Sequence, residues 1–84
     1  MIREGTLISK EPGLHTIFQG EEHNYVRCVI ADLIDPERQF ECRVLDETDI
    51  AIAIGAPIKL EVIKVVTERQ SGVVRFDCHL IHTE

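Results

Sequence analysis

The chain has 84 residues, of which 44% are hydrophobic and 29% charged, and its formal net charge is −6 at pH 7. This length leaves no room for a second domain, so we expect one domain over residues 1–84. The ordinary composition gives no support to disorder or repeats. No apolar run approaches the roughly 18 residues of a membrane span and no signal peptide is apparent, so we predict a cytoplasmic protein without a membrane partner.

The acidic surplus is confined to the first two thirds of the chain. Residues 1–56 contain five Lys or Arg against eleven Asp or Glu, whereas residues 57–84 contain four of each. Phosphate-driven binding of nucleic acid works through clustered Lys and Arg and through the release of counterions. This distribution of charge argues against generic binding of nucleic acid. It does not exclude binding through a local strip of basic residues.

The N-terminal part contains two strand-like segments, residues 6–9 and 14–18. Glu11-Pro12-Gly13 stands between them and predicts either a turn or a kink in one long, curved strand. The two alternatives correspond to six strands and five strands in the whole chain.

Residues 25–31 and 39–44 predict a β-hairpin. The first segment is rich in β-branched residues, and in the second segment polar residues alternate strictly with Phe40, Cys42 and Val44. This period of two is what a half-buried strand requires. The linker at 35–38 supplies turn chemistry, because its Pro36 fixes φ at the second turn position.

The segment from Asp46 to Pro57 carries signals for the start and the end of a helix. It has an acidic beginning, Thr and Asp caps, two alanines, a closing Gly55 and a Pro beyond it. These features predict about two turns of helix over residues 46–55. A strand is the alternative, since Ile50, Ile52 and Ile54 also alternate.

Residues 58–65 and 74–80 predict a second hairpin across a turn at 68–72. The alternation changes phase at Val62-Ile63, which predicts a β-bulge or a sharp bend. In the two hairpins, six apolar side chains should point inward together: Phe40, Cys42, Ile58, Leu60, Val74 and Phe76.

The expected order is three strands, a short helix and two strands, which makes the chain all-β. This order resembles the five-stranded OB-fold barrel, and the stretch from Asp46 to Val62 resembles the OB pattern of a short helix that ends at a Gly before an alternating strand. In length and strand layout the chain is also similar to the small single-stranded DNA-binding proteins of filamentous phages. The resemblance covers residues 5–82 and implies a small OB-like barrel of five or six strands that binds single-stranded nucleic acid without enzymatic activity.

Binding of a single strand needs an aromatic ring for base stacking and cations for the backbone. The outward faces of the second and third strands offer Tyr25 and both Arg27 and Arg43, and Phe18 would add a second ring if it lies outside the core. On the last hairpin, the acidic residues Glu61, Glu68 and Asp77 interrupt the series of Lys and Arg residues. We predict that the binding residues are Tyr25, Arg27, Arg43, Lys59 and Arg75. The alternative is that these are ordinary strand residues, with Arg43 paired to a carboxylate across the ladder.

The sequence offers no catalytic residues, metal ligands or cofactor site, so we predict that the protein is not an enzyme. Cys28, Cys42 and Cys78 fall on apolar strand positions, which predicts buried, reduced thiols. Adjacent strand residues point to opposite faces, so Cys78 and His79 do not suit one tetrahedral zinc site. We expect His79 and His82 to belong to a frayed, solvated terminus.

The charge of residues 1–56 supports a second hypothesis. The chain would be a protein-interaction barrel, for example a phage or plasmid accessory or inhibitor protein, whose acidic surface engages a basic partner protein or mimics nucleic acid. A homodimer is compatible with either role, because small barrels often pair their edge strands.

Overall fold

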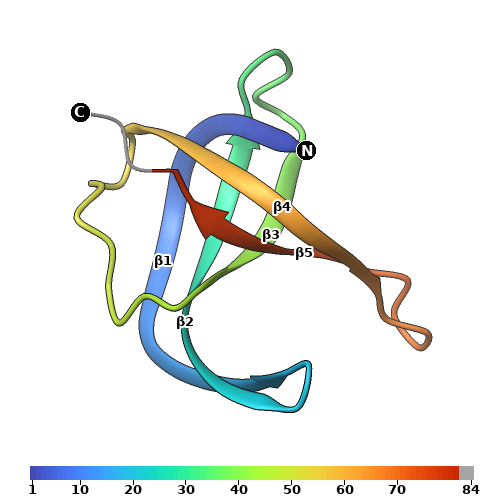
Figure 1. The fold of residues 1–84 in the computed structure, drawn as a ribbon. Helices are drawn as coiled ribbons and strands as arrows, with labels where there is room; N and C mark the ends of the chain where they lie inside the picture. The colour runs from blue at the N-terminus through green and yellow to red at the C-terminus, as the bar shows by residue number, and fades with distance from the viewer. Residues whose placement is uncertain (82–84) are drawn as a thin grey trace.

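Five strands form one mixed sheet that closes into a ring (Figure 1). A computed structural model describes residues 1–81. Its strands are β1 (Ile2–Phe18), β2 (Glu21–Asp32), β3 (Gln39–Leu45), β4 (Pro57–Thr67) and β5 (Val74–Leu80). Their order in the ring is β1-β2-β3-β5-β4, and the contact between β3 and β5 is parallel whereas the other four contacts are antiparallel. The prediction of an all-β chain is confirmed.

The ring is not a regular barrel, because its strands differ in length from 7 residues in β3 and β5 to 17 residues in β1. The register between β1 and β2 shifts at two places, one of them between Glu11 and Leu14. Gly13 lies in that gap and has a φ of 77°, a conformation that Gly adopts without steric cost. Glu11-Pro12-Gly13 is therefore a kink within one long strand, and residues 1–81 form five strands.

Both predicted hairpins are present. β2 and β3 pair from Tyr25 opposite Leu45 to Ala31 opposite Gln39, which confirms the turn at 35–38. β4 and β5 pair with a register shift between Val62 and Lys64. This shift confirms the bulge that the change of alternation predicts.

The core fills the ring with side chains from alternate positions. Of the six residues predicted to point inward, Cys42, Ile58 and Leu60 are buried. Phe40 and Phe76 are partly buried and pack on the core with their rings edge to face, 5.5 Å apart. The prediction for Val74 is wrong, since this residue is 42% exposed. It is the first residue of β5 and pairs with Thr67, the last residue of β4. The end of the β4–β5 hairpin projects beyond the ring (Figure 1).

The helix predicted over residues 46–55 is wrong, and no helix occurs in residues 1–81. The segment runs as an irregular connection whose backbone bonds to β1: Gly55 N–H donates to the Leu7 carbonyl at 2.7 Å, and Leu7 N–H donates to the Ala56 carbonyl at 3.0 Å. Ile50 is 3% exposed and Ile52 packs on the core. Burial of these side chains and pairing with β1 outweigh the local helix signals. Residues 1–81 therefore contain no helix that is long and apolar enough to cross a bilayer.

Candidate functional site

A polar groove of about 270 Å³ lies on the outer side of β2, β3 and the β4–β5 hairpin. It is lined by Tyr25, Arg27, Glu41, Arg43, Glu68 and Arg75. Tyr25 and Arg27 share one face of β2 because alternate strand residues point to the same side. The parallel pairing of β3 with β5 places Arg75 opposite Glu41. The structure thus brings together four of the five residues that the sequence predicts for nucleic acid.

Lys59 is the exception. Its Nζ atom lies 3.1 Å from Glu4 Oε1, and the residue lines a different pocket together with Leu33 and Ile81. Lys64 lies elsewhere on β4, with its Nζ 5.8 Å from the ring centre of Phe18. The basic residues of the last hairpin therefore do not form one continuous strip.

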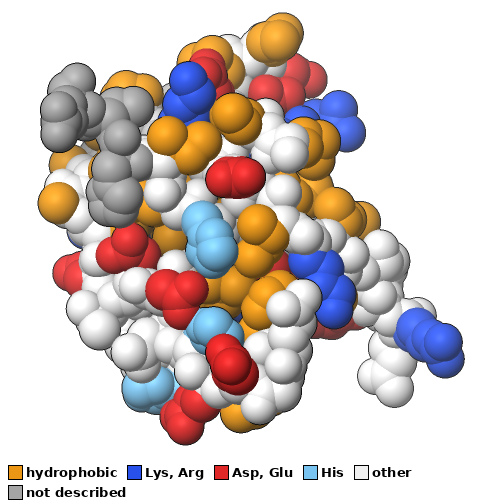
Figure 2. All heavy atoms as spheres, in the orientation of Figure 1, with side chains coloured by type: hydrophobic (Ala, Val, Ile, Leu, Met, Phe, Trp, Pro, Cys, Tyr) orange, Lys and Arg blue, Asp and Glu red, His pale blue; other side chains and the backbone are white. Residues whose placement is uncertain are grey.

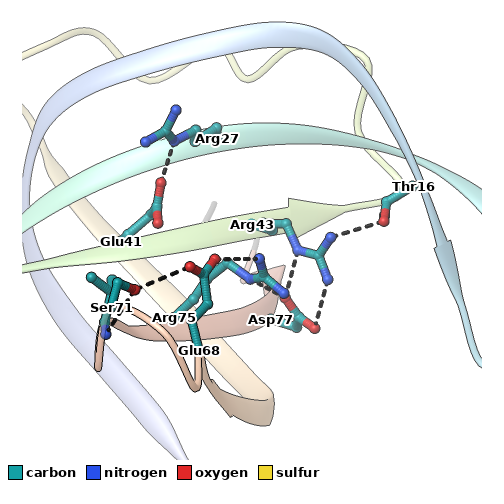
Figure 3. Close-up of polar contacts among 9 residues, drawn as sticks. Thr16, Arg27, Glu41, Arg43, Glu68, Ser71, Arg75 and Asp77 are labelled. Carbon is teal, nitrogen blue, oxygen red and sulfur yellow. Dashed lines mark hydrogen bonds and ion pairs between the residues drawn. The ribbon is translucent and has the colours of Figure 1, made fainter.

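Asp77 contacts two of the residues that line the groove, Arg43 and Arg75 (Figure 3). Its side chain is 1% exposed, and Arg43 donates to both of its carboxylate oxygens, from Nε at 2.8 Å and from Nη2 at 3.1 Å. The Arg43 guanidinium also donates from Nη1 to Thr16 Oγ1 at 2.8 Å. The hydrogen bonds to Asp77 raise the pKa of Arg43 above its ordinary value.

Sequence reasoning missed the role of Asp77, because strict alternation assigns it to the solvent-facing side of its strand. The side chain does lie on that side, but Arg43 and Arg75 cover it, with Arg75 Nε 3.7 Å from Asp77 Oδ1. Arg43 does pair with a carboxylate, which is the alternative that the sequence offers to a nucleic-acid contact. The carboxylate proves to come from β5.

Each arginine of the groove has a carboxylate partner. Arg27 donates through Nε to Glu41 and lies 3.9 Å from Glu11, while Arg75 lies 3.9 Å from Glu68. Together with the Arg43 pair, three guanidinium groups face four carboxylates, so this cluster has a formal net charge of −1. An anionic ligand would have to compete with these internal partners.

Two aromatic rings stand outside the core. Tyr25 lines the groove, and the Arg43 Cζ atom lies 5.4 Å from its ring centre, so that a cation occupies one face of the ring. Phe18 is partly buried at the β1–β2 hairpin and contacts His23 edge to face, with the ring centres 5.9 Å apart. Phe18 lines a separate pocket and adds no second ring to the groove.

A second polar cluster lies next to Phe18. His23 Nδ1 is 2.5 Å from Asp46 Oδ1, and His79 Nε2 is 3.4 Å from Asp46 Oδ2. Figure 2 shows histidine and acidic side chains beside one another on this face. The hydrogen bond to Asp46 raises the pKa of His23 above its ordinary value, and the same bond lowers the pKa of Asp46. The expectation of a frayed His79 is wrong, because His79 belongs to β5; His82 lies outside the described residues.

The three cysteines are free and buried in the core. Burial is the main cause that raises the pKa of Cys28 to about 11. The pKa of Cys42 is raised by its hydrogen bond with the Cys78 thiol and by burial. Cys28 and Cys42 therefore remain protonated near neutral pH, a state in which a thiol is a poor nucleophile.

Comparisons with protein-family models, curated protein sequences and solved structures found no match for this chain. In residues 1–81, His, Cys, Asp and Glu side chains do not assemble into a group of three or more that could hold a metal ion.

The buried Arg43–Asp77 pair predicts a large effect of one substitution. Asp77→Ala leaves Arg43 and Arg75 beside each other without their shared carboxylate, and we expect it to lower the free energy of unfolding by about 3–5 kcal/mol. Glu41→Ala removes the partner of Arg27, whose side chain is 52% exposed, and should cost less than about 1 kcal/mol. Urea titration of both variants measures the difference. Equal losses of unfolding free energy in the two variants would show that Asp77 is no more important to stability than an exposed ion-pair partner.

The His23–Asp46 pair predicts a pH dependence of stability. Because Asp46 raises the pKa of His23 above 6.5, the pair stabilises the fold fully below pH 6.5, and this contribution is lost as the pH rises through the raised pKa. The lowered pKa of Asp46 preserves the contribution above pH 3.8, and it is lost as the pH falls through that lowered value. NMR titration should show the His23 pKa falling toward 6.5 in Asp46→Asn and not in the control Asp35→Asn. A His23 pKa that is the same in both variants would refute this coupling.

Proposed function

We propose that this chain is a non-enzymatic, OB-like module that binds single-stranded nucleic acid in the groove lined by Tyr25, Arg27, Arg43 and Arg75. The ring of five strands in the order β1-β2-β3-β5-β4 supports the OB-like assignment. The groove lies over the second and third strands, the surface that OB folds use for oligonucleotides. The observation that carries the proposal is the convergence of one aromatic ring and three guanidinium groups on this groove.

The three arginines have different roles in this proposal. The side chain of Arg27 is 52% exposed and is the most accessible to a phosphate. Arg75 Nη1 lies 3.9 Å from Glu68, beyond hydrogen-bond distance, so this end of the guanidinium keeps a donor for a second phosphate. Arg43 donates hydrogen bonds to Asp77 and Thr16, and its guanidinium lies over one face of the Tyr25 ring. In this proposal a base stacks on the opposite face of the Tyr25 ring.

The carboxylates in the groove limit the electrostatic part of binding. Two phosphate contacts, by Arg27 and Arg75, correspond to a slope of about −1.4 in a plot of log K against log salt, at about −0.7 per contact for a single strand. Stacking on Tyr25 contributes about 1–3 kcal/mol for one base. Such a site binds weakly, and the module works together with a partner or in an oligomer.

Fluorescence anisotropy with a labelled oligothymidylate at low salt tests the proposal. Tyr25→Leu removes the stacking surface and should weaken binding at least about fivefold, and Arg27→Ala should weaken binding and make the salt slope shallower by about 0.7. Lys59→Ala, outside the groove, is the matched control and should bind like the unsubstituted protein. Absence of binding, or an equal loss in Lys59→Ala and Arg27→Ala, would refute the proposal.

A second function is favoured by the loop that follows β2. Leu33 is 57% exposed and Ile34 is 92% exposed, and both line a pocket together with Arg3, Glu4 and Asp32. The acidic residues Asp35 and Glu37 follow in the same loop. Apolar side chains in an acidic setting suit a partner protein that offers an apolar pocket with a basic rim. This is the acidic protein-interaction module that the charge distribution supports.

Pull-down from a lysate at two salt concentrations tests this second function. The unsubstituted protein should retain a basic protein at low salt and release it at high salt, with no nucleic acid in the eluate. The double substitution Leu33→Ser and Ile34→Ser should abolish retention, whereas Arg27→Ala should leave it unchanged. Retention of the same protein by the double variant would exclude this loop as the contact.

A further inference from the structure

One edge of β4 is unpaired where the strand leaves the ring. β1 pairs with β4 only from Thr6 opposite Pro57 to Ile2 opposite Glu61. Val62 N–H still donates to the Met1 carbonyl at 2.7 Å. From Ile63 to Thr67, β4 has β5 along one side, and among residues 1–81 no strand pairs with its other side. Figure 1 shows this part of the hairpin projecting away from the ring.

The alternation of the ladder identifies the backbone groups at this edge. Glu68 N–H donates to the Val73 carbonyl at 3.0 Å, next to the pair formed by Thr67 and Val74. In an antiparallel ladder every second residue directs its N–H and C=O to the same neighbour, so Val66 also directs these groups to β5. The N–H and C=O of Val65 and Thr67 therefore point away from β5, toward the unpaired side. Such groups are a template for another strand.

The side chains around this edge are largely apolar. Val65 is 52% exposed and Ile63 is 40% exposed, and on the neighbouring β5 strand Val74 is 42% exposed. Val74 lies opposite Thr67 in the ladder, so it and Val65 contribute to one face of the projecting hairpin. Lys64 and Glu68 lie on the other face, because their positions differ from that of Val65 by odd numbers.

Within the chain, Glu68 accepts a hydrogen bond from Ser71 Oγ at 3.1 Å and lies 3.9 Å from Arg75 Nη1. Lys64 Nζ lies 5.8 Å from the centre of the Phe18 ring. A Lys64 side chain from a second copy of the chain would therefore add a contact to those that Glu68 already makes.

We propose that two copies of this chain form a homodimer by antiparallel pairing of their β4 edges, with Val66 opposite Val66 of the second copy. In this register Val65 lies opposite Thr67 of the second copy, so the outward N–H and C=O groups of both residues are satisfied. The same register sets Lys64 opposite Glu68 of the second copy, and the twofold symmetry makes this pair twice. Opposite charges directly across a ladder stabilise it.

Charge complementarity selects this register over its nearest competitor. If Val65 lay opposite Val65 of the second copy, the hydrogen bonds could also form, but Lys64 would face Val66 and both charge pairs would be lost. The proposed register uses residues 63–69, which lie beyond the segment of β4 that β1 covers. The dimer does not require nucleic acid, although Glu68 also lines the groove proposed above.

Sedimentation equilibrium with complementary charge variants tests the dimer and its register. Lys64→Glu alone and Glu68→Lys alone each place like charges opposite one another in both symmetric pairs. We expect the dimer dissociation constant to rise about tenfold in each variant. An equimolar mixture of the two variants restores both opposite-charge pairs, so a heterodimer should form with an affinity close to that of the unsubstituted dimer.

Arg38→Glu is the matched control, because it makes the same change of charge as Lys64→Glu in the exposed loop between β2 and β3. This variant should dimerise like the unsubstituted protein. Recovery in the mixture distinguishes loss of pairing from loss of fold, since a misfolded variant would not form the heterodimer. A monomer at every concentration, a dimer unaffected by both charge variants, or a mixture that stays monomeric would each overturn the proposal.

Discussion

The ring closes at the parallel contact between β3 and β5, and the Arg43–Asp77 ion pair holds that contact in register. The two strands share four residue pairs, one of which is Arg43 with Asp77. A slip by one residue would turn Asp77 toward the core and Cys78 toward the outside. Because the Asp77 side chain is 1% exposed and that of Arg43 is 13% exposed, such a slip would leave buried charges without partners. We infer that the pair specifies the register more than it adds net stability.

The same ion pairs give the groove its shape and limit its charge. Arg43 is committed to Asp77 and Thr16, and Arg27 is held by Glu41, so the convergence of three arginines does not produce a basic surface. A ligand that binds here gains less from phosphate attraction than from contact with the Tyr25 ring. This balance is consistent with a chain of net charge −6. The acidic surroundings of Leu33 and Ile34 are a separate consequence of that charge, in another part of the molecule.

The bulge at Ile63 accounts for three features at once. An extra residue bends a strand and increases its local twist. After the register shift between Val62 and Lys64, β4 continues past the residues that β1 covers, and β5 follows it. The hairpin therefore projects from the ring, its outer edge is unpaired, and Val74 is exposed although its position in the alternation matches that of Phe76.

The sequence by itself determined the all-β class, both hairpins and the bulge, because the alternation of apolar residues is a local property of the chain. It could not determine the course of residues 46–55, since the groups that bind Gly55 and Ala56 belong to Leu7 of β1. Tertiary structure also decided that Tyr25, Arg27, Arg43 and Arg75 meet while Lys59 lies apart, and that Asp77 is buried. Arg43 and Asp77 are 34 residues apart, and no pattern within one strand reports a contact between strands so distant in the chain.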